Sequence, residues 1–171
     1  MKNSTDKSTA AKDRISSSIG SAGKRTAQHP TSVKKTELFA RLVSENNYGG
    51  MKAINSIRNG YPAEILKSAG YFFDVPETRI HIIVQVAAST ASRLQKKHAK
   101  IDSAATERIY RMGAVARMAI DIFENKDSAI EWMRLPNHSL GDVAPLDLMD
   151  TEPGAATVRQ VLNAIATGSV V

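Results

Sequence analysis

The sequence predicts an all-α protein, with an N-terminal helix-turn-helix bundle followed by a small helical domain. Three observations lead to this fold class. After residue 33, apolar residues recur at the three- and four-residue spacing of helices. Residues that favour helix caps and first turns precede several of these stretches. No segment alternates apolar and polar residues for long enough to predict a strand.

The composition is that of a folded protein with few special constraints. The chain has 171 residues, of which 42% are hydrophobic and 23% charged, so most of it can form a packed core. It contains no cysteine, which excludes disulfides and thiolate metal sites. The chain starts with polar residues, and no run approaches the ~20 apolar residues of a membrane helix. We therefore expect a soluble, cytoplasmic protein without a secretory signal or a membrane partner.

Charge is distributed unevenly along the chain. The total is +6, yet residues 118–171 hold eight acids and three bases and so carry −5. Residues 1–117 therefore carry +11. A basic first part and an acidic second part predict two different partners, of which the first is a polyanion.

Three segments are predicted from these changes in composition. Residues 1–32 are rich in Ser, Thr, Lys and Ala and cannot bury enough apolar surface to fold. We expect a disordered basic tail there, either simply solvated or adding nonspecific attraction to phosphates. Residues 33–108 are predicted to form the helix-turn-helix domain, and residues 109–171 the C-terminal domain.

Helices follow one another closely in the first half. The polar segment 46–50 separates a predicted helix around Phe39 from a short helix over Met51–Arg58, which a glycine ends. The next helix starts near Pro62 and presents an apolar stripe to the core. The run Asp74-Val75-Pro76-Glu77 has the pattern of an N-cap, a first-turn proline and a capping-box acid, so it predicts another helix start.

The second half begins with a short helix predicted over Ala88–Lys97. Asp102 is the expected N-cap of a long helix that continues to Glu124, and this helix could join the two halves or take part in a dimer interface. Asn125 or Asp127 is expected to cap a helix through Met133.

A loop is predicted over residues 137–150, before the last helix. Thr151 is the expected N-cap of that helix, Pro153 stands in its first turn, and Gly168 ends it.

The two short helices on either side of Val86 resemble a helix-turn-helix of the Xre-like kind. Ile80 and Val84 would be core positions of the first helix, and Ala91 and Leu94 would anchor the second. The second helix would then expose hydroxyls, an amide and bases, the groups that contact phosphates and base edges in a major groove. These candidate DNA-binding residues are Ser89, Thr90, Ser92, Arg93, Gln95, Lys96, Lys97 and Lys100.

Two positions depart from the usual helix-turn-helix pattern. His81 stands where a small residue is usual, and Gln85 stands where the turn normally holds glycine. The alternative interpretation is a small helical bundle with a solvated basic face. The four histidines are far apart in the sequence, and none is paired with a second metal ligand at helical spacing, so we expect no metal site.

Many separated residues near the C-terminus occur together in an order typical of one family. They are Ala129-Ile130-Glu131-Trp132-Met133, Pro136-Asn137, Leu140-Gly141, Pro145-Leu146-Asp147-Leu148, Thr151, Gly154, Val158, Leu162 and Gly168. This part resembles the toxin-binding domain of the Xre/MbcA/ParS antitoxin family, over about Ile109–Val171 and more loosely from Met51. Met133 stands where leucine is usual, and Asp142 where a second glycine is common.

The same residues have structural interpretations without the family. Trp132, Met133 and Leu135 are expected to form a large apolar anchor rather than a ligand platform. Asp147 is expected to cap a turn or accept hydrogen bonds from loop amides rather than to act in catalysis.

The resemblance implies an antitoxin whose partner is a RES-type toxin, which degrades NAD. Its C-terminal domain would cover the toxin, with the extreme C-terminus at or in the active-site cleft; the alternative is a frayed terminus without contacts. The candidate toxin-binding residues are Arg159, Thr167, Gly168, Ser169, Val170 and Val171. The resemblance also implies a homodimer that binds operator DNA in its own promoter as an autorepressor.

Two other classes of function compete with an antitoxin. A stand-alone helix-turn-helix transcription regulator, whose C-terminal domain dimerises or binds another protein, would use the same residues; an adjacent gene for a RES-like protein would favour the antitoxin. An enzyme would need paired carboxylates, a nucleophile with its base, or a phosphate-binding glycine loop at motif spacing. The sequence has none of these, so we expect neither catalysis nor a cofactor.

Overall fold

The computed structural model describes residues 37–45 and 49–168, and all of its regular elements within these ranges are helices. The only extended pairings there are two isolated bridges, Pro62 with Lys100 and Asn137 with Val143. The prediction of an all-α fold is therefore confirmed. The predicted tail, residues 1–32, lies outside the described residues, as do Ser169, Val170 and Val171.

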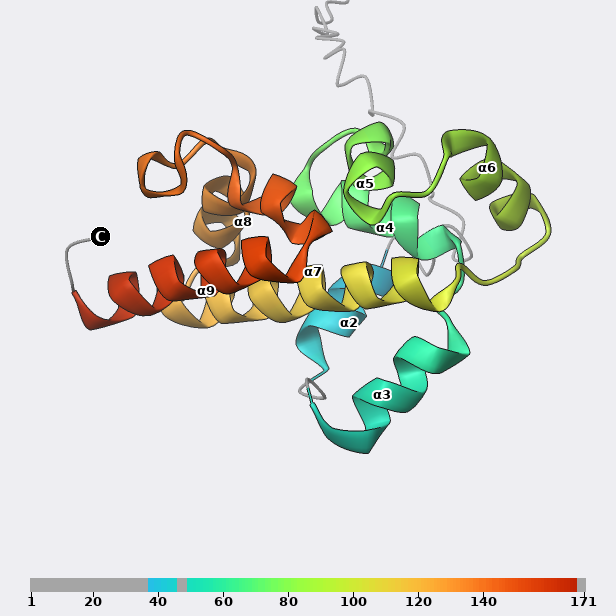
Figure 1. The fold of residues 1–171 in the computed structure, drawn as a ribbon, viewed down its shortest axis with the longest axis horizontal. Coiled ribbons are helices and arrows are strands. Elements are labelled where there is room, and N and C mark those ends of the chain that lie inside the picture. Colours follow the sequence, from blue (N-terminus) through green and yellow to red (C-terminus); the bar gives the residue numbers. More distant parts are fainter. Residues whose placement is uncertain (1–36, 46–48, 169–171) are drawn as a thin grey trace, which may run out of the picture.

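The helices form two groups around a long central one (Figure 1). In chain order they are α2 (Leu38–Ser44), α3 (Gly50–Asn59), α4 (Glu64–Phe73), α5 (Glu77–Val84), α6 (Ala88–Lys96), α7 (Ser103–Phe123), α8 (Lys126–Arg134), the 3-10 helices η1 (His138–Leu140) and η2 (Pro145–Asp150), and α9 (Glu152–Thr167). Figure 1 shows α9 running beside the second half of α7, while α6 lies at the other end of the molecule. None of these described helices is both long and apolar enough to cross a membrane.

The central helix α7 supports elements from both halves of the chain. It contacts α2, α3 and α5, which precede it in the chain, and α8, η2 and α9, which follow it. Ile109, Met112 and Val115 are fully buried along it and belong to one continuous apolar core. The helix therefore joins the two halves of the chain, and its part in a dimer interface stays a prediction. The domain boundary predicted between residues 108 and 109 falls inside it.

Three predicted helix starts are confirmed by capping hydrogen bonds. Asp102, Asn125 and Thr151 each accept a hydrogen bond from the backbone N–H three residues later, at 2.8, 2.9 and 3.2 Å. Each such cap satisfies a donor that the helix itself leaves unpaired. Of the two residues considered as the N-cap of α8, Asn125 is the N-cap and Asp127 lies within the first turn. Gly168 ends α9 in the left-handed conformation, as predicted.

Asp74 is not the N-cap that the sequence predicts. It ends α4 in the left-handed conformation, with φ 52°, which an aspartate tolerates better than most residues. Its carboxylate accepts a hydrogen bond from Nη1 of Arg134 at 2.6 Å. Pro76 takes the position before α5, which begins at Glu77. Asp74 therefore lies in the short connection that ends α4 rather than at the start of α5.

The segment predicted as a loop over residues 137–150 is more ordered than expected. It contains η1 and η2, and Leu146 and Met149 of η2 are fully buried. Leu135, predicted as part of the apolar anchor, is instead 48% exposed, whereas Met133 is only 1% exposed. The chain leaves α8 in an extended conformation at Leu135, which turns this side chain outward, and η2 supplies the apolar contacts instead.

Candidate DNA-binding and toxin-binding surfaces

Helices α5 and α6 are joined by a three-residue turn. Gln85 takes the left-handed conformation, with φ 57°, at the position where glycine is usual. Such a conformation costs a side chain about 1 kcal/mol relative to glycine. Arg108 of α7 holds the turn in place, because Nη2 donates to Oε1 of Gln85 at 2.8 Å and Nη1 donates to the carbonyl of Val84 at 3.3 Å. Val86, the next residue of the turn, is buried.

A polar cluster lies between the two helices of this pair. Nε2 of His81 is 3.2 Å from Oε1 of Glu77, and the amide of Gln95 donates to the same oxygen at 2.7 Å. The structure therefore places the amide of Gln95 toward the protein, although the sequence assigns it to the exposed face. The pattern of α6 alone does not reveal this partner, because Glu77 lies on the preceding helix, α5. His81 thus lies against Glu77, and no group of three or more acids and histidines that could hold a metal ion occurs in the described parts of the chain.

Most other candidate DNA-binding residues lie on the surface. Ser89, Ser92 and Arg93 are exposed on α6, and Thr90 is half-buried. The exposed bases that follow are Lys96, Lys97 and Lys100, and Nζ of Lys100 donates to the carbonyl of Asn59 at 2.9 Å. Hydroxyls and positive charge thus share one surface at the end of the molecule formed by α6.

The far end of the molecule is built around α8, η2 and α9. Trp132 packs against Phe123 of α7 with ring centroids 5.8 Å apart, and the tryptophan is half-buried on the core. Val158 and Leu162 of α9 are fully buried. Gly154 lies so close to η2 that a Cβ atom there would be 2.3 Å from the carbonyl oxygen of Leu148.

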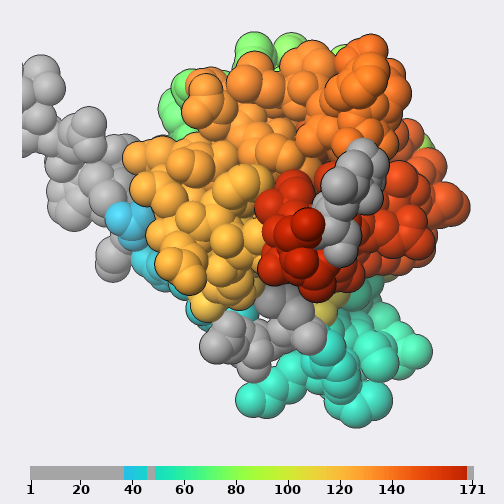
Figure 2. All heavy atoms as spheres, turned by 90° about the vertical axis from the view of Figure 1, so that its left-hand side faces the viewer, coloured from blue at the N-terminus to red at the C-terminus, as the bar shows by residue number. Residues whose placement is uncertain are grey.

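The candidate toxin-binding residues of α9 do not all lie together. Arg159 forms an ion pair with Glu152, which also lies 3.2 Å from Nε of Arg111. Thr167 is eight residues further on, about 12 Å along the helix axis. Thr167 and Gly168 are exposed where α9 ends. Figure 2 views the molecule from this end and shows the last turn of α9 at the surface.

Known proteins match both parts of the chain. The sequence model of the antitoxin Xre/MbcA/ParS C-terminal toxin-binding domain matches residues 118–168. A protein named "Antitoxin Xre" from Photorhabdus laumondii is 31% identical over 119 residues, which are 68% of this chain and 80% of the relative. The chain belongs to the Xre/MbcA/ParS antitoxin family. Another "Antitoxin Xre", from Yersinia enterocolitica, is 27% identical over 143 residues, 83% of this chain and 97% of the relative.

The match assigns the partner of the second half of this antitoxin. The toxin-binding domain begins within α7 and includes α8, η1, η2 and α9. The antitoxin therefore has a toxin as its partner and is part of a toxin-antitoxin system. The longer match to the Yersinia protein extends the likeness well beyond this domain.

Arginines connect the toxin-binding domain of the antitoxin to the α5–α6 pair. Arg79 of α5 donates to both carboxylate oxygens of Asp147 at 2.8 Å, and it also donates to the carbonyl of Arg134 at 3.3 Å. The role of Asp147 is structural, but the interpretation that it caps a turn or accepts from loop amides is wrong. Its partner lies 68 residues away, which local sequence patterns do not reveal. Arg108 adds a bond to the carbonyl of Asp150 at 3.3 Å.

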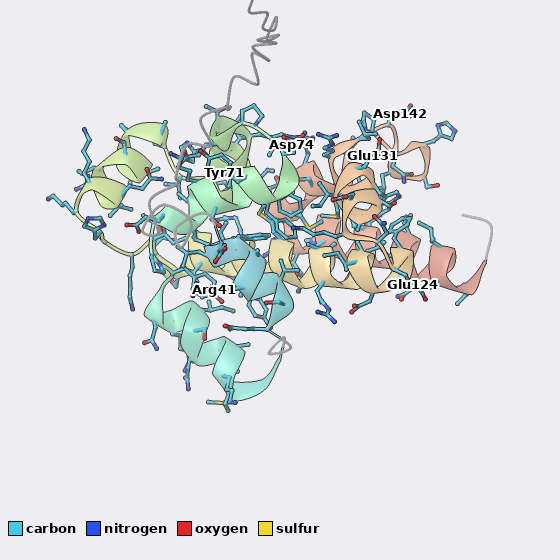
Figure 3. All side chains as sticks on the ribbon, turned by 180° about the vertical axis from the view of Figure 1, so that it is seen from behind. Arg41, Tyr71, Asp74, Glu124, Glu131 and Asp142 are labelled. Carbon is cyan, nitrogen blue, oxygen red and sulfur yellow. The ribbon has the colours of Figure 1, made fainter. Side chains whose placement is uncertain are left out.

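A groove between α4 and α8 of the antitoxin carries both signs of charge. Figure 3 shows Tyr71 and Asp74 on the same side of the molecule as Glu131, and all three line this groove of about 380 Å³. Lys126 and Arg134 line it as well, and Arg134 is bonded to Asp74. The mixture gives the groove little attraction for a polyanion, in contrast to α6.

A second hollow, of about 320 Å³, lies beside α3 and contains two tyrosines. Burial raises the pKa of Tyr61, and Tyr110 and Glu45 raise it further. Burial also raises the pKa of Tyr110, against the opposing effect of a hydrogen bond with the backbone of Gly49. Both hydroxyls of the antitoxin therefore stay protonated at neutral pH, and neither is prepared to act as a base or nucleophile.

Proposed function

We propose that the protein silences a RES-type, NAD-degrading toxin with its C-terminal end and represses its own operon by binding promoter DNA as a homodimer through α6. It acts in the cytoplasm, by binding alone and without catalysis or a cofactor. The observation that carries the first part is the match to a toxin-binding domain that includes the whole of α9. Thr167 and Gly168 are exposed at the end of that helix, and Ser169, Val170 and Val171 follow them in the sequence.

Inhibition in this proposal is occlusion of the toxin's cleft. Ser169 offers a hydroxyl for hydrogen bonds, while Val170 and Val171 offer apolar surface to bury. Thr167 and Gly168 lie at the rim of the contact. Arg159 lies about two turns back along α9, where it would extend the contact area rather than enter the cleft.

The test is deletion of Ser169–Val171, which leaves the described core untouched. Co-expression of the neighbouring gene with the full chain should allow growth, and co-expression with the shortened chain should not. Both forms should give the same melting temperature and should co-purify with the toxin, because α8 and α9 still provide a contact surface. A matched control replaces Lys96 and Lys97 with alanine, which should leave neutralisation unchanged.

Two results would contradict the proposal. Full neutralisation by the shortened chain would show that the cleft is not occluded by these residues. A neighbouring toxin that leaves cellular NAD intact would show that the partner is not of the RES type.

DNA binding rests on the charge and exposure of α6. Ser89, Ser92, Arg93 and Lys96 provide the donors and positive charge that duplex DNA requires. Their surface lies at the opposite end of the molecule from the tip of α9 (Figure 1). DNA and toxin can therefore be bound by the same chain without competing for the same surface.

A further inference from the structure

An apolar groove lies beside the turn between α5 and α6. It has a volume of about 380 Å³, and it is lined by Ile82, Val86, Ala87 and Ala88 together with Thr78, His81 and Gln85. Ile82 is 75% exposed, more than any other large hydrophobic residue in the described parts of the chain. Ile80, Ile83 and Val84 of the same helix are buried, so the exposure of Ile82 follows from the helical repeat.

The groove adjoins the leading turn of α6, which has its own chemistry. Ala87 occupies the position before the helix and Ala88 begins it, and both are exposed together with Ser89. No charged side chain stands on this turn. The bases come later, at Arg93 and Lys96. The leading end of α6 thus offers methyl groups and a hydroxyl, whereas the trailing end offers positive charge.

The four bases differ in the chemical groups that they present in the major groove, and so in how well they fit against an apolar protein surface. Guanine, cytosine and adenine present only hydrogen-bond donors and acceptors there, which would be left without partners against carbon. Thymine alone presents a methyl group. A methyl group can be buried against alanine and isoleucine with a gain in free energy. The bases that follow on α6 supply the complementary charge that brings DNA phosphates to this surface.

We propose that the groove between Ile82 and Ala88 receives the 5-methyl group of a thymine in the promoter half-site. The leading turn of α6 then selects a T·A pair, while Arg93 and Lys96 hold the phosphates. This inference rests on the proposed DNA-binding function and names the base that the same surface reads.

The experiment replaces thymine with deoxyuridine, which removes only the methyl group. The full chain is titrated against the DNA upstream of its own gene, with each thymine of the protected site replaced in turn. One position per half-site should lower affinity about three- to sixfold, the effect expected for one buried methyl group. Replacements outside the protected site serve as the control and should have no effect.

Variants of the groove show whether this protein surface causes the effect. Ala88→Ser and Ile82→Ser should bind thymine and uracil DNA about equally, because the apolar contact is lost. Neither should unfold the protein, since both side chains are exposed. Arg93→Ala is the matched control: it should weaken binding to both DNAs and keep their ratio.

Each contrary outcome has a distinct meaning. Specific promoter binding without sensitivity to any thymine methyl would overturn this inference and leave the DNA-binding proposal intact. A different outcome is that Ile82→Ser changes the oligomeric state and leaves the ratio of affinities for thymine and uracil DNA unchanged. That result would show that a second copy of the chain occupies the groove, so it would also overturn this inference and leave the DNA-binding proposal intact. Absence of specific promoter binding would overturn both proposals.

Discussion

Single residues on α6 divide between the protein interior and the solvent, and this division decides which of them the proposed DNA contact can use. Gln95 is committed to Glu77, whereas Arg93 and Lys96 extend from the exposed face. All three belong to the predicted DNA-binding face, although at about 100° per residue Gln95 points about 160° away from Arg93 on the helix. The neighbour across the helix pair removes the glutamine, and that neighbour cannot be identified from the pattern of α6 alone.

We expect Arg93→Ala and Lys96→Ala each to weaken promoter binding and to reduce its dependence on salt, because each removes a phosphate contact and the counterions released with it. The slope of log affinity against log salt should fall by about one per lost contact. Fluorescence anisotropy at several salt concentrations measures this.

The control for these variants is Arg58→Ala, which removes an exposed base from α3 instead of α6. It should leave the salt slope almost unchanged. Equal effects of Arg58→Ala and Arg93→Ala would mean that binding follows the total charge rather than the α6 surface.

At the level of helices, the sequence predicts well what local chemistry determines. The starts of α7 and α9 follow from Asp102 and Thr151, whose side chains bond to backbone amides three residues away. The errors occur where the partner is distant. Asp74 pairs with Arg134 across 60 residues, and Asp147 pairs with Arg79 across 68, so their local patterns suggest caps that do not form.

The candidate site is predictable to a similar degree. The exposed basic face of α6 and the exposed end of α9 follow from composition, from helical spacing and from the family resemblance. The groove at Ile82 was missed because large aliphatic residues fill most of the run from Ile80 to Val86, which only His81 and Gln85 interrupt. Only the packing of α5 shows which of its residues faces outward.

The junction between η2 and α9 allows a sharp test at Gly154. We expect Gly154→Ala to lower the free energy of unfolding by about 2–3 kcal/mol, because the added Cβ atom would lie 2.3 Å from a backbone oxygen. Urea unfolding followed by circular dichroism measures this. Gly141→Ala is the control, since Gly141 has positive φ but open space around it, and should cost only about 1 kcal/mol. Equal costs would show that the backbone around Leu148 shifts to relieve the close approach at Gly154.

Across the whole molecule, one core and a set of arginine bonds join the α5–α6 pair to the toxin-binding domain. The bidentate pair of Arg79 with Asp147 crosses from α5 to η2, and α7 lies beneath both. An arginine that donates to both oxygens of one carboxylate has better hydrogen-bond geometry than a typical surface ion pair.

We expect a double-mutant cycle of Arg79→Ala and Asp147→Ala to give a coupling free energy of about 1 kcal/mol, measured by urea unfolding. The pair of Arg117 with Asp121 within α7, joined by a single hydrogen bond of 3.0 Å, is the control and should give about 0.3–0.5 kcal/mol. A coupling for Arg79 and Asp147 no larger than the control would show that this bond does not hold the two parts together.

The length of α7 has a consequence for how such antitoxins diversify. With 21 residues it extends about 31 Å, and its buried face must suit neighbours from both halves of the chain at once. Substitutions there are restricted by two sets of contacts, whereas α6 and the tip of α9 each face outward at separate ends. With the DNA surface proposed on α6 and the toxin contact proposed at the tip of α9, operator preference and toxin preference could change independently, each by substitutions at its own end of the molecule, while α7 stays the same.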